Sequence, residues 1–134
     1  MTSPHEFLNP THWRQPSGYS NGVAARGRLI VTGGVIGWNA EEVIESDDFA
    51  AQAAQALRSI VEILACAGAK PDHLVRLTWY VTDKREYLGA LKDLGAAYRD
   101  IIGKHFPAMA LVQVVALVED RAKVEIEATA VVPD

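Results

Sequence analysis

The stretch from Lys104 to Val132 most constrains the fold, because it contains two extended apolar segments joined by a polar turn. Met109 to Val118 is an almost unbroken apolar run, which predicts a strand buried on both faces. Apolar and polar residues alternate from Lys123 to Val132, which predicts a strand with one buried and one polar face. The polar face carries two carboxylates, Glu125 and Glu127. We therefore expect a sheet core with acidic groups on one side.

Two helices are expected before this stretch. Apolar residues recur at helical spacing between Ser46 and Gly68, where Ser46 or Asp47 suits the N-cap and Gly68 the end. A second helical stripe begins after Asp83, which resembles a cap, and ends at Gly103. β-type residues at 74–81 predict a strand between the two helices.

Two short strands are expected near the N-terminus, from Tyr19 to Ala25 and from Arg28 to Val35, with Arg26-Gly27 as a plausible hairpin turn. Gly33 and Gly34 interrupt the second strand, which favours a bulge or a close approach of another group. The order β-β-α-β-α-β-β indicates an α+β fold with two helices on one face of the sheet.

Two helices can cover only one face of a sheet of this size, so the second face would be left uncovered. It would expose a large apolar patch (Met109, Leu111, Val115 and Leu117), so we expect another subunit to cover it. The same face would carry Glu125 and Glu127 if the register allows. Polar groups in such an interface need partners or a wet cleft.

Composition predicts one domain from the 134 residues, with residues 1–16 as a proline-rich, irregular arm that docks by Phe7 and Trp13, and residues 17–134 as the folded unit. No signal peptide or membrane segment is visible, so a cytoplasmic protein is expected. A net charge of −4 argues against a nucleic-acid partner. The one cysteine and the unlinked histidines give no metal motif, and no cofactor fingerprint occurs. His105 is a candidate for proton transfer.

Several short motifs occur in an order that is similar to the RidA/YjgF family, also called the L-PSP endoribonuclease family. They are Pro16-Ser17-Gly18-Tyr19-Ser20, Thr32-Gly33-Gly34, Ala67-Gly68-Ala69, Val81-Thr82-Asp83, Phe106-Pro107-Ala108 and Val124-Glu125-Ile126-Glu127-Ala128. The resemblance covers Ser17 to Val132 and implies a chorismate-mutase-like fold. It also implies a homotrimer with its sheets inside and small-molecule clefts between subunits. Typical members hydrolyse enamines and imines derived from amino acids.

The resemblance also implies that an arginine should follow Phe-Pro-Ala and grip the substrate carboxylate, whereas Met109 stands there. A thioether cannot pair with a carboxylate, so the usual 2-imino acid is not the expected substrate. Gly33 replaces the usual serine, Gly95 stands where many members have asparagine, and Leu111 replaces a small or thiol-bearing residue. The matching positions are Tyr19, Tyr98 and Glu125.

These positions predict a cleft lined by Met109, Leu111 and Trp38, in which Glu125 handles water and Tyr19 stacks on the ligand or donates a hydrogen bond. Backbone N–H groups near Gly34 and Ala110 would receive a developing oxyanion. A neutral or aromatic substrate fits, as does one whose acid lies far from the reacting carbon. The expected substrate-binding residues are Tyr19, Gly33, Gly34, Trp38, Gly95, Tyr98, Met109, Ala110 and Leu111.

Three functions stay open on the sequence. The first is a divergent deaminase or hydrolase acting on a small enamine, imine or carbonyl compound. The second is a non-catalytic binder or regulator built on the same trimer. The third, a ribonuclease, is supported by the family's alternative name alone. Glu125 is equally well explained as an interface carboxylate, and Glu127 is better explained as structural.

Overall fold

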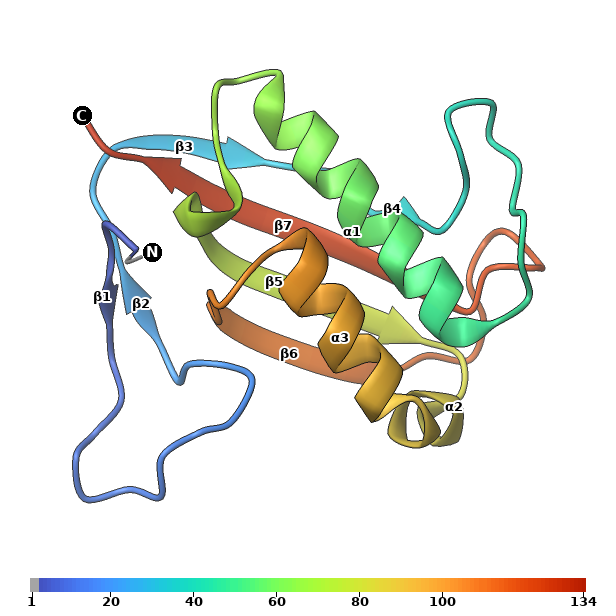
Figure 1. Cartoon of the computed structure of the whole chain (residues 1–134), viewed down its shortest axis with the longest axis horizontal. Helices are drawn as coiled ribbons and strands as arrows, with labels where there is room; N and C mark the ends of the chain where they lie inside the picture. Colours follow the sequence, from blue (N-terminus) through green and yellow to red (C-terminus); the bar gives the residue numbers. More distant parts are fainter. Residues whose placement is uncertain (1–2) are drawn as a thin grey trace.

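A mixed sheet with helices on one face forms the body of the protein in this computed structural model, which describes residues 3–134 (Figure 1). The sheet contains β3 (Arg28–Val31), β4 (Val35–Ile36), β5 (Leu74–Val81), β6 (Ala108–Gln113) and β7 (Val124–Val132). Its order is β3-β7-β5-β6, and β4 also pairs with β7. β7 is antiparallel to its neighbours, whereas β5 and β6 are parallel.

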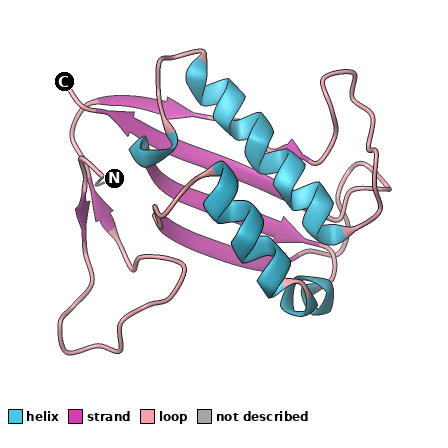
Figure 2. Cartoon of the chain, viewed as in Figure 1, coloured by secondary structure: helices cyan, strands magenta, loops and turns pink. Residues whose placement is uncertain are grey.

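The long helix α1 (Phe49–Ala65) and the shorter α3 (Leu91–Ile101) lie side by side on the same face (Figures 1 and 2). Leu57, Ile60 and Leu64 of α1 are almost wholly buried against this face, because they recur at helical spacing. From β7, Val124 and Ile126 reach the same core. The expected α+β fold, with helices on one face, is confirmed.

The helix boundaries differ in detail from those expected. Asp48, and not Ser46 or Asp47, caps α1, because its carboxylate accepts a hydrogen bond from the Ala51 N–H at 3.0 Å. Ser46 supports this cap by accepting from the Asp48 N–H. Gly68 follows α1 with a positive φ of 72°, as the expected end requires.

The expected second helix is divided in two. Asp83 caps α2 (Lys84–Gly89) as expected, and its carboxylate accepts from the Arg85 N–H. The chain leaves helical geometry at Ala90 and resumes as α3. Gly89 stands at this break, where a residue with weak helix propensity is tolerated most easily.

The apolar run that suggested a strand from Met109 to Val118 is strand only as far as Gln113. The reason is pairing, because β5, the neighbour of β6 in the sheet, ends at Val81 opposite Gln113. Beyond that point Val115 and Val118 lie in a loop and are fully exposed. The prediction that this strand continues to Val118 was wrong.

The N-terminal segment forms a small sheet of its own. β1 (Glu6–Phe7) pairs with β2 (Val23–Ala24), so the arm is not wholly irregular and the expected hairpin across Arg26-Gly27 is absent from the described residues. β3 pairs with β7 instead of β2. Phe7 contacts the His105 ring at a centroid distance of 5.7 Å, whereas Trp13 remains exposed.

The glycine pair lies in a one-residue bulge, as one of the two interpretations of the sequence predicts. Four positions separate Val31 from Val35, while three separate their partners Thr129 and Ile126 on β7. Thr32 fills the irregularity, since its hydroxyl accepts from the Ala128 N–H at 3.0 Å.

Among the described residues, the helices are all too short or too polar to span a bilayer. The face of the sheet that the helices do not cover carries exposed apolar side chains from the two outer strands, β3 and β6. They are Leu29, Val31 and Val112.

Candidate functional site

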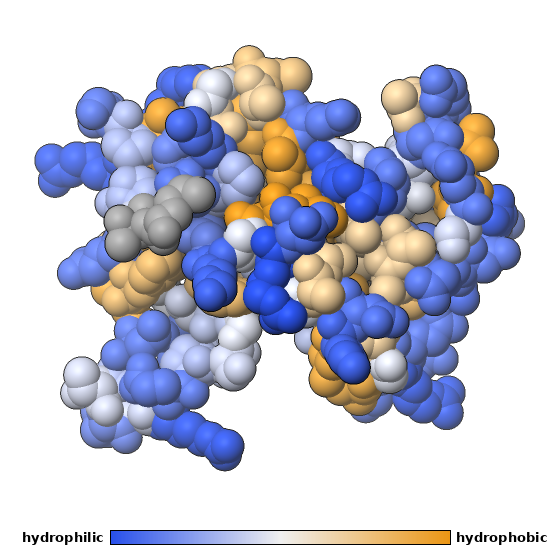
Figure 3. All heavy atoms as spheres, viewed as in Figure 1, coloured by the Kyte–Doolittle hydropathy of each residue, from blue (hydrophilic) through white to orange (hydrophobic). Residues whose placement is uncertain are grey.

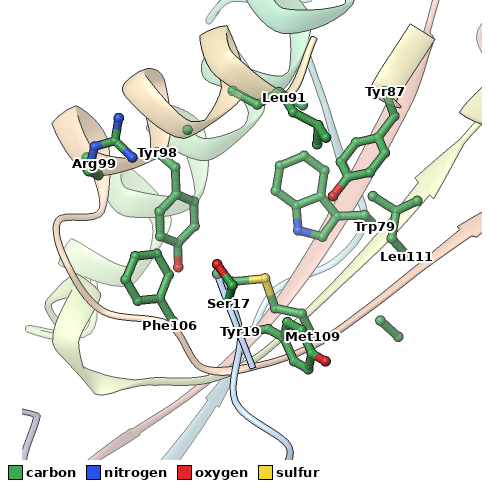
Figure 4. A pocket seen from close by; sticks show the side chains of 14 residues that line it. Ser17, Tyr19, Trp79, Tyr87, Leu91, Tyr98, Arg99, Phe106, Met109 and Leu111 are labelled. Carbon is green, nitrogen blue, oxygen red and sulfur yellow. The ribbon is translucent and has the colours of Figure 1, made fainter. Parts of the chain in front are cut away.

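A cleft of about 670 Å³ opens between α3, the end of α2 and the outer strand β6. In the space-filling view, the surface of the helix side is hollowed between the N-terminal arm and α2 (Figure 3). The close-up shows the side chains that surround the space (Figure 4). Its lining residues are Ser17, Gly18, Tyr19, Trp79, Tyr87, Leu91, Leu94, Gly95, Tyr98, Arg99, Phe106, Met109, Ala110 and Leu111.

One wall of the cleft is built around Tyr98 of α3. Its hydroxyl donates to the His105 carbonyl at 2.6 Å, and its ring stacks on Phe106 at 5.5 Å between centroids. Burial raises the pKa of Tyr98 far above the ordinary tyrosine value. The phenol is therefore a neutral, already bonded group, and it shapes the wall without serving as a proton donor to a ligand.

The floor of the cleft comes from the strands β5 and β6. Trp79 and Leu111 are direct neighbours across these strands, as are Leu77 and Met109. Because Leu77 and Trp79 face the helices, Met109 and Leu111 must face them too. Met109 thus lies where it can contact a molecule in the cleft.

A second group of residues lies on the helix-free face of the sheet. Glu125 is half buried there, and its carboxylate lies so close to Gly34 that a Cβ at position 34 would collide with it. Among the described residues, no hydrogen bond or ion pair engages the Glu125 carboxylate. Gly33, next to it, faces open space.

Glu127 lies on the same face but is already engaged. It accepts a hydrogen bond from the Tyr80 hydroxyl at 2.7 Å, which raises the pKa of that phenol together with burial and the charge of Glu127. This pairing agrees with the structural role expected for Glu127. Glu125 is the carboxylate of the pair that stays available.

The sequence model of the family described as Endoribonuclease L-PSP matches residues 13–132. The chain belongs to this family. The L-PSP relatives include the 2-iminobutanoate/2-iminopropanoate deaminase of Escherichia coli K12, which is 35% identical over 108 residues, covering 78% of this chain and 80% of the relative. The Salmonella typhimurium protein of the same name is 32% identical over the same length.

Solved structures of the family share this fold. The Rid-family protein YyfB of Yersinia pestis, described as of unknown function, aligns with a TM-score of 0.84 and 31% identity over 96% of this chain and 98% of its own. Rv2704 of Mycobacterium tuberculosis, described as a YjgF-family protein, aligns with a TM-score of 0.63 and 33% identity over 96% of this chain and 99% of its own.

The site residues expected for an L-PSP family member fall into two groups in one chain. The cleft collects six of them: Tyr19, Gly95, Tyr98, Met109, Ala110 and Leu111. Gly33, Gly34 and Glu125 lie on the opposite face of the sheet. The expectation that Met109 and Leu111 share a face with Glu125 and Glu127 was wrong, because the register sets them on opposite sides.

Trp38 belongs to neither group. It packs against a small cluster formed by Ile36, Ile44 and Ala122 at the far end of β4, together with Leu117. His105 is also outside the cleft, and its Nε2 is engaged with the Leu74 carbonyl at 2.7 Å. Burial lowers the pKa of His105, so the ring is held neutral near pH 7.

Sequence reasoning missed several polar side chains of the cleft, among them Trp79 and Arg99. Trp79 sits at an alternating core position of β5, where a tryptophan usually signals packing. Arg99 follows Tyr98 directly and is one of several exposed charges on α3. The signal that could have revealed it is its spacing of four residues from Gly95, which puts both on one helix face.

Proposed function

We propose that this protein is a divergent RidA-like hydrolase that deaminates a small enamine, imine or related carbonyl compound in a cleft shared between subunits of a homotrimer. The relatives named as imine deaminases support the reaction class. The observation that carries the proposal is the half-buried, unengaged carboxylate of Glu125, held against Gly34. It is a base placed where a water molecule or a C=N group can approach.

The chemistry needs one group that moves protons. In an imine, water adds to the C=N carbon while the Glu125 carboxylate takes one of its protons and passes it to the nitrogen, which gives a carbinolamine. The carboxylate then carries the hydroxyl proton of the carbinolamine to the nitrogen as the C–N bond breaks, so that ammonia leaves and a C=O group forms. An enamine first takes a proton on its carbon to become the imine. The products are ammonia and a carbonyl compound, with no oxidant or reductant required.

The composition of the cleft in one chain supports a site that two subunits share. Its lining contains no carboxylate and no imidazole, and of its three phenols that of Tyr98 is already bonded. Glu125 stands on the other face of the sheet, which also carries the exposed side chains of Leu29 and Val31. In a ring of subunits, the helix-free face of one chain can close the cleft of the next. This arrangement would bring the Glu125 carboxylate of one chain to the cleft of its neighbour.

Met109 sets the substrate preference in this proposal. A 2-imino acid would bring its carboxylate against a thioether, where an unpaired charge is costly. We therefore expect weak turnover of 2-iminobutanoate and 2-iminopropanoate, and better turnover of compounds without a carboxylate beside the reacting carbon.

The test is ammonia release from freshly generated substrates, with a standard 2-imino acid in one arm and a neutral aromatic enamine in the other. The Glu125→Gln variant should lose about a hundredfold or more in kcat, in the range of general acid–base catalysis. Glu127→Gln serves as the matched control. If no compound turns over faster than in buffer, the deaminase proposal fails.

A non-catalytic binder is the second candidate, because the lining of the cleft in one chain includes no carboxylate and no imidazole. Glu125→Gln separates the two functions. A binder keeps its ligand affinity in this variant and releases no ammonia in the parent protein.

A further inference from the structure

The cleft contains a buried hydrogen-bond donor that no other group of residues 3–134 uses. Trp79 is 6% exposed, and its indole Nε1 has no hydrogen-bond partner among the described residues. Figure 4 shows the indole nitrogen directed toward the space that the labelled side chains enclose. A buried N–H without a partner destabilises the fold, and an acceptor atom of a ligand would remove this cost.

The cleft also contains one charged side chain, the guanidinium of Arg99 at its α3 rim (Figure 4). No hydrogen bond or salt bridge to this side chain is present among residues 3–134. Gly95, one turn earlier on α3, leaves room for it, because a Cβ there would lie 3.4 Å from Arg99 Nη1. The guanidinium therefore folds back along the helix beside the cleft.

Between these two groups the surface is apolar and aromatic. Tyr98 and Phe106 form a stacked wall, and Met109 lies on the floor. A ligand that satisfies the whole cleft needs an apolar or aromatic body, an acceptor atom for the buried N–H, and negative charge at the rim.

We propose that this cleft binds a small organic acid with an apolar body, whose anionic group pairs with Arg99 while an acceptor atom receives the Trp79 indole N–H. The anionic group of the ligand would thus lie at the rim on α3 and not at the floor, where Met109 cannot pair with it. This inference deepens the proposed function and rests on it for the claim that the bound acid is a substrate. The substrate class is an imine or enamine whose acid group lies away from the reacting carbon.

The two contacts differ in what they contribute. Arg99 is exposed, so water and salt weaken its pairing with a carboxylate, and its main effect is a choice between acid and neutral analogues. The Trp79 N–H is buried, so a hydrogen bond to it is strong and oriented, and it applies to acid and amide alike.

The test is a titration of the full-length, ¹⁵N-labelled protein with phenylacetate and, separately, with phenylacetamide. Indole N–H signals are read by NMR, and Trp79→Phe assigns the Trp79 signal. We expect both probes to move this signal and leave that of Trp38 unmoved. Phenylacetate should bind about tenfold more tightly than the amide, a difference of about 1.4 kcal/mol.

Variants of two arginines decide whether the preference comes from the rim. Arg99→Gln should lower phenylacetate affinity to the level of the amide. Arg58→Gln, a matched exposed arginine on α1, should leave both affinities unchanged. Three results would overturn the proposal. The first is equal binding of acid and amide to the parent protein, and the second is an equal affinity of the two variants for phenylacetate. The third is a Trp79 signal that does not move at millimolar probe.

The titration measures no turnover, so it separates this inference from the proposed function. Acid selectivity through Arg99 in a protein that releases no ammonia would refute the deaminase function alone. Ammonia release that survives Arg99→Gln with an acidic substrate at unchanged KM would refute this inference alone.

Discussion

The carboxylate of Glu125 on β7 lies against the α-carbon of Gly34, in the bulge between β3 and β4. This contact is possible because residue 34 has no side chain. The backbone of Gly34 does not have the positive φ that excludes other residues, so the contact alone accounts for the need for glycine here.

Gly34→Ala should therefore displace the Glu125 carboxylate while the fold is kept. We expect at least about a tenfold loss of kcat in ammonia release, because a misplaced catalytic group loses most of its advantage. Gly89→Ala is the matched control, since a Cβ there meets open space. Equal activity of the two variants would show that the contact has no catalytic importance.

Glu127 should be replaceable without loss of function. Its Oε1 accepts from the Tyr80 hydroxyl, and the amide oxygen of a Glu127→Gln variant can accept the same bond. The kcat of this variant should stay within about twofold of the parent. A loss as large as that of Glu125→Gln would mean that both carboxylates take part in the reaction.

Met109→Arg should restore the substrate preference of the deaminase relatives. An arginine here can pair with a carboxylate through two parallel hydrogen bonds, which raises kcat/KM for 2-iminobutanoate by about tenfold or more. Met109→Leu, which changes shape but adds no charge, should give no gain. If the two variants behave alike, position 109 does not set the preference.

Stability should fall in acid because of His105. Burial lowers its folded-state pKa below the ordinary 6.5, and the hydrogen bond to the Leu74 carbonyl opposes this only in part. Between the lowered folded pKa and 6.5 the unfolded chain binds more protons, so the free energy of unfolding drops as pH falls through this window.

Urea unfolding at about pH 7.5 and about pH 5.5 measures this effect. His105→Gln keeps a donor toward Leu74 but cannot titrate, so its midpoint should change less between the two pH values than that of the parent. His12→Gln, in the exposed arm, should behave as the parent does. An unaltered pH response in His105→Gln would exclude this histidine as the cause.

The sequence predicts local features well where one residue decides the outcome. The alternation in β7 correctly assigns Val124 and Ile126 to the core, and the pair Gly33-Gly34 correctly marks a bulge. The end of β6 was missed because it depends on where β5 stops, which is information about a neighbour in space.

The candidate site was only partly foreseeable for the same reason. Resemblance points to Tyr19, Tyr98 and Met109, and the fold does bring them to one cleft. It could not show that Glu125 lies on the other face, because face assignment across strands needs the register. The unpaired N–H of Trp79 is likewise a property of packing that no pattern displays.

The division of the site between two faces leads to the most direct test of the shared cleft. Glu125→Gln removes the acid, and Met109→Trp fills the cleft, so each variant alone should be inactive. Co-expressed with different tags and purified as mixed trimers, the two should recover about a third of the parent activity, because one of the three seams in each mixed ring pairs an intact acid with an open cleft. Mixed trimers, verified by native mass spectrometry, that release no ammonia would contradict a site built from two chains.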